Sequence, residues 1–150
     1  MNLIDNIKIS NAMTEASSGT GTSTGLALDM SGFEGCLFIL HGTTIFGTTT
    51  TVALRAKGAT STAGTWVFYE PTVSSTVCAA ASYDYHVFAL DMYKPLKRYI
   101  RPCITGQTSE LKIARTVTAI RYGARYPGST NLYDSTTLAG VTLAVGATSS

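Results

Sequence analysis

The feature that most constrains this chain is a series of short segments in which apolar and polar residues alternate. In the clearest of them, TVALRAKG (51–58), one side of an extended chain is apolar and the other polar: Val52, Leu54 and Ala56 against Thr51, Arg55 and Lys57. This period of two is typical of a half-buried β-strand. Two further segments of this kind, TWVFYE (65–70) and VFALDMYKPLKRYIRPCITG (87–106), follow after turn residues. The sequence therefore predicts a small antiparallel β-sandwich.

Composition limits the classes of function. A chain of 150 residues fits one domain, and charged residues make up only 13% of it, against about 25% in an average protein. A surface of small neutral side chains suits flat packing against other protein subunits. The net charge of +2 argues against an electrostatic nucleic-acid binder. No apolar run approaches the ~20 residues of a membrane span, and the N-terminus lacks the pattern of a secretory signal.

The sequence predicts three parts. Residues 1–25 are interpreted as an N-terminal arm that docks through a first short strand and continues as a linker, because 11–25 is rich in Ser, Thr and Gly. Residues 26–123 form the β-sandwich domain, with 71–85 as an irregular crossover of the Greek-key kind. Residues 124–150 form a C-terminal arm, in which Val141, Leu143 and Val145 alternate as in a strand donated to a neighbouring sheet. The alternatives are a disordered terminus or pairing with an edge strand of the same chain.

Two segments are predicted to meet other chains. FEGCLFILHG (33–42) is apolar on both sides, with Phe38 on one and Ile39 on the other, so it lies either centrally beneath a covering segment or at a subunit interface. TTIFGTTTT (43–51) is typical of a hairpin loop with Ile45 and Phe46 at its tip. Those side chains either contact a partner or fold back onto the edge of the sandwich.

No residue pattern predicts catalysis, a metal or a cofactor. Asp84, His86 and Asp91 lie close in sequence, but no nucleophile elbow of the GxSxG kind accompanies them. His41 has no partner at metal-ligand spacing. Three cysteines without CxxC spacing predict small buried residues instead of a disulfide framework or zinc site, and favour a reducing compartment: Cys36, Cys78 and Cys103. The sequence thus predicts a non-enzymatic protein without cofactor.

The densest basic cluster consists of Lys94, Lys97, Arg98 and Arg101, and an extended chain splits these charges between two faces. They either pair within the fold with Glu70, Asp84 and Asp91 or form a rim that meets the acidic surface of a partner protein.

Four segments carry a resemblance to a known family. W-x-F-Y (66–69), V-F-A-L-D-M-Y-K-P (87–95), K-R-Y-I-R-P (97–102) and A-I-R-Y-G (119–123) resemble, over about residues 50–123, small proteins from the structural gene clusters of tailed bacteriophages. Members of this kind are capsid decoration, or cement, proteins. The resemblance implies a jelly-roll β-sandwich that forms dimers or trimers on the outer shell. Here the sandwich carries extended arms at both ends, which leaves a head-completion or tail role open.

The expected function is therefore a virion structural protein that is made in the bacterial cytoplasm and bridges major capsid protein subunits. It self-associates and binds neither nucleic acid nor membrane. The residues expected at its interfaces are Phe38, Ile45, Phe46, Arg98, Arg101, Val141, Leu143 and Val145. The alternative is a carbohydrate- or receptor-binding sandwich with an aromatic platform of Trp66, Tyr69, Tyr83, Tyr85 and Tyr93. The alternation of Trp66 with its neighbours predicts that Trp66 and Phe68 face the core, which argues against that platform.

Overall fold

The structure is a computed structural model that describes residues 6–17, 21–42, 51–69, 76–79, 87–106 and 113–125. These residues form strands and loops, with no α-helix among them. The strands are β1 (Ile7–Ser17), β2 (Gly21–Thr24), β3 (Leu28–Asp29), β4 (Gly35–Gly42), β5 (Thr51–Ala59), β6 (Val67–Phe68), β7 (Thr76–Ala79), β8 (Val87–Tyr93), β9 (Tyr99–Gly106) and β10 (Ile113–Tyr122).

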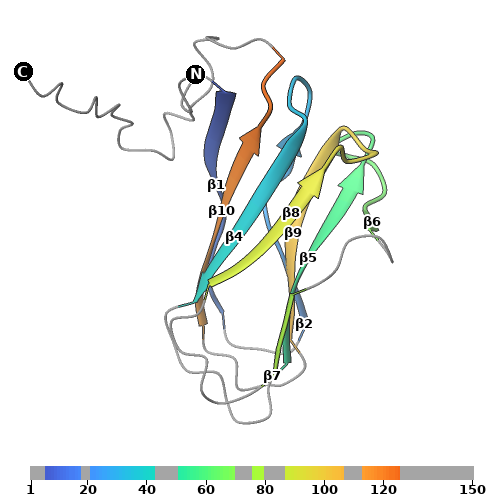
Figure 1. The fold of residues 1–150 in the computed structure, drawn as a ribbon. Helices are drawn as coiled ribbons and strands as arrows, with labels where there is room; N and C mark the ends of the chain where they lie inside the picture. The colour runs from blue at the N-terminus through green and yellow to red at the C-terminus, as the bar shows by residue number, and fades with distance from the viewer. Residues whose placement is uncertain are drawn as a thin grey trace, which may run out of the picture.

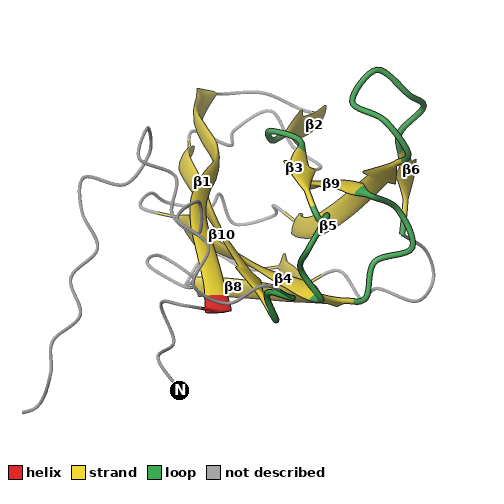
Figure 2. Ribbon diagram, turned by 90° about the horizontal axis from the view of Figure 1, so that it is seen from above, coloured by secondary structure: helices red, strands yellow, loops and turns green. Residues whose placement is uncertain are grey.

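Two antiparallel sheets pack face to face. The first, called here the four-stranded sheet, has the order β1-β10-β4-β8 (Figure 1). The second sheet has the order β2-β9-β5-β6, and β3 and β7 pair with β9 and β5 at other points along those strands. Seen from above, the two sheets form the two layers of a sandwich (Figure 2). The prediction of an all-β antiparallel sandwich is confirmed.

The strand pairs are nested. β1 pairs with β10, β2 and β3 pair with β9, β4 pairs with β8, and β5 pairs with β7. Each pair lies within the preceding one along the chain, as in one long hairpin. Two further pairings, of β10 with β4 and of β9 with β5, roll that hairpin into two sheets. This connectivity is that of a jelly roll.

The core lies between the two inner faces and follows the alternation of the strands. Along β8, Phe88, Leu90 and Met92 are buried while the residues between them are exposed. Across the core, the largest fully buried apolar side chains come from four strands: Phe38, Leu54, Ile100, Ile104 and Val117. In β5, Leu54 and Ala56 point inward, and Arg55 and Lys57 lie on the opposite face as predicted.

A buried arginine closes one end of the core. Arg121 of β10 is 7% exposed, and its guanidinium donates hydrogen bonds to the Asp29 carbonyl oxygen and to Ser10 Oγ, both at 2.9 Å. Ser10 belongs to the four-stranded sheet and Asp29 to the second sheet. The guanidinium also lies 5.2 Å from the centre of the Phe33 ring. Through these two hydrogen bonds the side chain of Arg121 joins the two layers. The bonds also replace the hydration that its buried charge has lost.

The predicted first strand does dock, but the interpretation of residues 11–25 as a loosely held linker outside the sandwich is wrong. β1 is eleven residues long and pairs with β10 along its length, and its Ala12 and Met13 are 0% and 5% exposed within the core. The strand continues through its small polar residues because a β-bulge at Asn11/Met13 shifts the register there, with Asn11 Oδ1 accepting a hydrogen bond from Met13 N at 3.2 Å. The sandwich begins at β1, not at residue 26.

The short segment after β2 binds both sheets through its backbone. Gly25 N donates to the Pro102 carbonyl of β9, and Leu26 N donates to the Ala12 carbonyl of β1, both at 2.8 Å. Any Cβ at position 25 would lie 2.5 Å from the Ala12 carbonyl oxygen, so the close approach requires glycine.

Parts of the predicted organisation lie outside the described residues. They include the loop 43–50 with Ile45 and Phe46, and residues 126–150 with Val141, Leu143 and Val145. Within the predicted crossover 71–85, residues Thr76–Ala79 form β7, which pairs with β5.

The placement of β1 can be tested with Met13→Ala. A core position predicts a loss of about 2–5 kcal/mol in the free energy of unfolding, because truncation removes buried apolar surface and leaves a cavity. Leu26→Ala is the control, since Leu26 is 63% exposed and its truncation should change that free energy by less than about 0.5 kcal/mol. Urea denaturation followed by circular dichroism measures both. Equal stability of the two variants would mean that β1 is not part of the core.

Candidate functional site

The outer face of the four-stranded sheet carries an apolar patch, next to polar positions of the same face such as Asn11, Thr118 and His41. Its centre is a cross-strand row in which Ile9 pairs with Ile120 and Ile120 with Leu37. The residues that surround this row on the same face, called together with it the apolar outer face, are Ile7, Ile39, Val87, Ala89, Tyr93 and Tyr122. Of the described elements, the second sheet covers only the inner face (Figure 2).

Exposure increases from the centre of this face to its edge. Ile9, Leu37, Ile39 and Ile120 are half-buried by their neighbours within the sheet, whereas Val87 and Tyr93 on the edge strand β8 are 60% and 62% exposed. Larger exposed apolar patches often occur where proteins contact other molecules, so this face is a candidate interface.

Among the described positions of this face, Asp91 is the one residue with a formal charge. Its carboxylate accepts a hydrogen bond from a neighbouring side chain of the same face. Tyr122 Oη donates to Asp91 Oδ1 at 2.7 Å. The Tyr122 ring crosses β4 over Gly35, where a Cβ would collide with the ring. Burial of Tyr122, together with the hydrogen bond to Asp91, raises the pKa of its hydroxyl. The tyrosine thus links β10 to β8 across β4.

Phe38 was predicted at an interface, and the structure places it in the core instead. Its side chain is 0% exposed, so it is inaccessible to a partner. The neighbouring residues Leu37 and Ile39 point outward in its place, because side chains alternate along a strand. One reading of its two apolar sides predicted a central strand beneath a covering segment. β4 does lie centrally, between β10 and β8, but among the described residues no segment covers its outer side.

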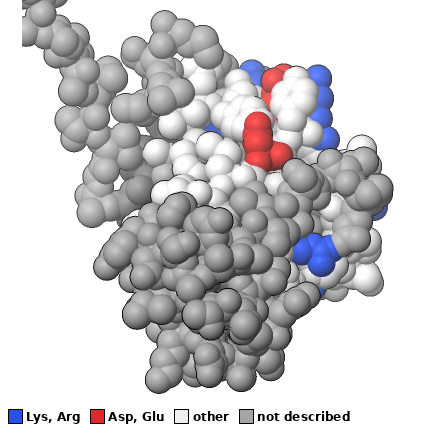
Figure 3. All heavy atoms as spheres, turned by 60° about the horizontal axis from the view of Figure 1, so that its bottom comes forward, with Lys and Arg blue, Asp and Glu red and all other residues white. Residues whose placement is uncertain are grey.

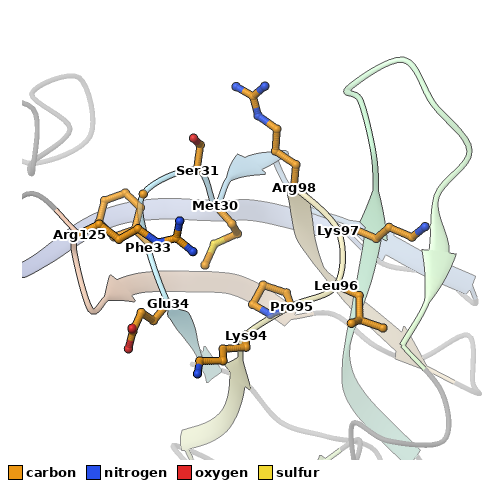
Figure 4. A pocket seen from close by; sticks show the side chains of 11 residues that line it. Met30, Ser31, Phe33, Glu34, Lys94, Pro95, Leu96, Lys97, Arg98 and Arg125 are labelled. Atoms are coloured by element: carbon orange, nitrogen blue, oxygen red, sulfur yellow. The ribbon is translucent and has the colours of Figure 1, made fainter.

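A pocket of about 460 Å³ lies at one end of the sandwich, between the loops 30–34 and 94–98 (Figure 4). Three backbone hydrogen bonds of 2.7–2.9 Å fasten its rim: Lys94 N to the Glu34 carbonyl, Met30 N to the Arg98 carbonyl and Arg125 N to the Gly32 carbonyl. Figure 4 shows Lys94, Lys97 and Arg98 pointing away from one another, so these cations do not converge on one ligand group.

Arg98 of the predicted basic cluster is paired within the fold. Its guanidinium donates to both carboxylate oxygens of Asp29, at 3.1 and 2.8 Å. This hydrogen bond from Arg98 lowers the pKa of Asp29. Pairing within the fold was one predicted alternative, but the acidic partner is Asp29, not Asp91. The other two predicted partners, Glu70 and Asp84, lie outside the described residues.

On the outer face of the second sheet, cations stack on aromatic rings. The Arg101 guanidinium lies 4.1 Å from the centre of the Trp66 ring. Arg55 and Lys57 lie 4.0 and 4.3 Å from the centre of the Phe68 ring. These five residues, called here the cation–aromatic row, correct the prediction that Trp66 and Phe68 face the core. The residue of that segment that packs against the core is Tyr69.

Two cysteines are free and buried, as predicted. Cys36 and Cys103 are each 0% exposed. Burial raises the pKa of the Cys36 thiol to about 12. Burial also raises the pKa of Cys103, against the opposing effect of Lys57, Arg101 and Arg55. The side chain of Cys78 lies outside the described residues.

Catalytic geometry is not assembled among the described residues. His41 is exposed at the end of β4, and Asp91 accepts the hydrogen bond from Tyr122. Asp84 and His86 lie outside the described part of the chain. Within that part, no group of three His, Cys, Asp or Glu residues is placed to hold a metal ion, and no helix is long and apolar enough to cross a membrane.

Comparison with known proteins assigns no family. No protein-family model matches the chain, and no curated protein matches it. Among solved structures, it is similar to a chain described under "Bacillus endospore appendages form a novel family of disulfide-linked pili". The similarity covers 79% of this chain and 89% of that chain, with 16% identity and a TM-score of 0.42. At these values it supports no functional inference.

The buried Cys36 makes stability depend on pH. In the unfolded chain a cysteine ionises near pH ~8.5, whereas in the fold Cys36 stays protonated until about 12. Between these values the unfolded state binds fewer protons, so the free energy of unfolding falls as pH rises, by at most about 1.4 kcal/mol per pH unit from this thiol.

Urea denaturation at a series of pH values between 7.5 and 10 (roughly the range in which free thiols ionise) measures this slope. Cys36→Ala should be less stable at the low end of this range and should show a smaller slope, because the other titrating groups are common to both proteins. Identical slopes for the two proteins would mean that Cys36 does not remain protonated in the fold.

Proposed function

We propose that this chain is a non-enzymatic structural subunit, a decoration protein that stabilises the capsid of a tailed bacteriophage by bridging its major capsid subunits. The observation that supports this most is the apolar outer face, with Ile9, Ile120 and Leu37 at its centre. The jelly-roll connectivity agrees with the fold that the resemblance implies. The low share of charged residues, 13% of the chain, is compatible with the proposal too. Among the described atoms visible in Figure 3, most belong to residues other than Lys, Arg, Asp and Glu.

The apolar outer face is proposed to pack against a second copy of this chain. Burying apolar surface contributes about 25 cal/mol per Å², and a stable contact needs roughly 800 Å² from each partner. Four strands ~4.8 Å apart and about seven residues long cover roughly 450 Å², so this face would form the centre of such a contact and adjoining surface would complete it. The single acidic group at its described positions, Asp91, accepts a hydrogen bond from Tyr122 and belongs to the edge strand β8, so its carboxylate can stay at the hydrated rim of such a contact.

Self-association would also serve attachment to a shell. A dimer or trimer presents two or three copies of its remaining surfaces at a fixed spacing. Contacts that are weak singly then add, because the second and third contacts form within one assembly. Such an oligomer could hold neighbouring capsid subunits together against the pressure of a packaged genome.

The alternative of a carbohydrate- or receptor-binding module has less support. Its aromatic platform requires Trp66, Tyr69 and Tyr93 on one surface. Trp66 stacks with Arg101 on the second sheet, whereas Tyr93 lies on the apolar outer face of the other sheet. Tyr69 packs against the core. Tyr83 and Tyr85 of the predicted platform lie outside the described residues.

Self-association through the apolar outer face is tested with the double variant Val87→Lys/Tyr93→Lys. Both side chains are at least 60% exposed, so the substitutions should leave the fold intact. Light scattering at micromolar concentration should give two or three chains of 15.8 kDa for the wild type and one chain for the variant. Val67→Lys is the control, because Val67 is 58% exposed on β6 of the other sheet. A monomeric wild type, or an oligomeric double variant, would contradict this interface.

The class of function is tested separately by binding. The protein should cosediment with empty capsids of the virus that encodes it and should give no signal on a glycan array. Saturable glycan binding without capsid binding would favour the carbohydrate-binding alternative.

A further inference from the structure

The outer face of the second sheet concentrates positive charge on two adjacent strands. Lys57 of β5 lies directly opposite Arg101 of β9 in the register, and Arg55 lies two residues from Lys57 on the same face of β5. Adjacent strands are ~4.8 Å apart, and alternate residues of one strand ~6.8 Å. Like charges opposite each other destabilise a sheet. The arrangement therefore costs stability, and a role in binding would account for its presence.

The aromatic rings hold these cations in place. Phe68 contacts both Arg55 and Lys57, and Trp66 contacts Arg101, with distances of 4.0–4.3 Å to the ring centres. Stacking uses one side of a guanidinium and leaves N–H groups at its edge for hydrogen bonds. Side chains already ordered in this way lose less conformational freedom when a ligand binds.

Two of the cations lack an anionic partner among the described residues. Arg98 provides the comparison, because its guanidinium forms an ion pair with Asp29 at 2.8 Å. Neither Lys57 nor Arg101 forms such a pair in the described part of the chain, and Arg101 Nε is buried there without a hydrogen-bond partner. An external carboxylate would pair with the charges of Lys57 and Arg101, whereas the buried Nε is out of its reach.

The three charges act on the same region. Burial is the largest effect on the Cys103 thiol and raises its pKa. The positive charges of three residues act in the opposite direction and lower that pKa: Lys57, Arg101 and Arg55. Cys103 lies opposite Arg55 in the register. Their fields therefore add on this face.

We propose that the cation–aromatic row binds an acidic polypeptide segment of a partner protein, with carboxylates at alternate positions of an extended chain. Same-side carboxylates in such a segment are ~6.8 Å apart, which matches the spacing of Arg55 and Lys57 along β5. Arg101 on β9 would take a third carboxylate or donate two hydrogen bonds to one of them. This surface lies on the opposite sheet from the apolar outer face, so the proposal does not depend on the proposed function.

The aromatic rings favour a polypeptide over a nucleic acid or a sugar. Bases and sugars bind proteins by stacking on open ring faces. In the row, Trp66 and Phe68 already have cations stacked on their rings. The net charge of +2 is too small to attract the continuous phosphate backbone of a nucleic acid, whereas the three cations of the row match a few carboxylates.

The test is a titration with a fluorescein-labelled decapeptide that alternates Glu and Thr, with the Gln–Thr peptide as the uncharged control. Anisotropy gives the affinity. With unlabelled peptide, emission from Trp66 gives the location, because Trp66 is the single tryptophan and lies against Arg101. We expect saturable binding of the Glu–Thr peptide, a change in Trp66 emission, and a loss of affinity of about tenfold or more between low and high salt.

Matched variants separate this site from general attraction. Lys57→Gln/Arg101→Gln should weaken binding at least tenfold, whereas Lys94→Gln/Arg125→Gln, which removes the same charge at the end pocket, should leave the affinity within about twofold. Circular dichroism checks folding, and the single variant Lys57→Gln replaces the double variant if that fails to fold. Arg101→Lys should retain part of the affinity.

Several results would overturn the proposal. They are the absence of binding, unchanged Trp66 emission during binding, equal weakening by both double variants, or a ten-nucleotide oligo-dT that binds more tightly than the peptide with the same variant dependence. The last result would identify the row as a nucleic-acid site.

Discussion

The structure depends on the position of β10 between β1 and β4. Through this one strand the last described part of the chain pairs with the first strand and with the central strand β4. Its inward side chains, Val117 and Ala119, belong to the core, and Arg121 joins the layers at one end. Its outward side chains, Ile120 and Tyr122, form the middle of the apolar outer face. Core and candidate interface therefore lie on opposite sides of the same strand. A shift in the register of β10 would change both at once.

The fold class could be predicted because alternation is a local signal. In β5 and β8 the inward residues are apolar and recur at every second position, and Val117 and Ala119 do the same in β10, so each of these strands is recognisable without its partner. A short first strand was predicted, but its extension to Ser17 was missed because residues 11–17 are mostly small or polar. They become a strand only by pairing with β10, which lies at the other end of the described chain. The partner of Arg98 was missed for the same reason, since Asp29 lies 69 residues away in sequence.

The candidate sites were harder to predict than the fold. Alternation along β4 places Phe38 on one face and Leu37 and Ile39 on the other. When both faces of a strand are apolar, this pattern does not show which face packs into the core. For Trp66 and Phe68, an apolar pattern suggested burial. β6 is only two residues long and lies at the edge of its sheet, where neighbouring cations cover the rings instead. A signal was present in the sequence, because Arg55 and Lys57 lie on the polar side of β5, but linking them to Phe68 and Arg101 required the register of three strands.

The two outer faces differ in the physical basis of the contacts they favour. The apolar outer face gains free energy by excluding water, a contribution that salt does not screen, whereas the cation–aromatic row acts through charges whose range shortens as salt rises. Because the faces belong to opposite layers of the sandwich, two partners could bind without competing for the same residues. An assembly held by both kinds of contact would keep its apolar contact at high salt and lose the ionic one. The end pocket differs from both faces, because backbone hydrogen bonds fix its rim while its cations point apart. Its geometry is explained by closure of the sandwich, in which the loops carry the chain between layers.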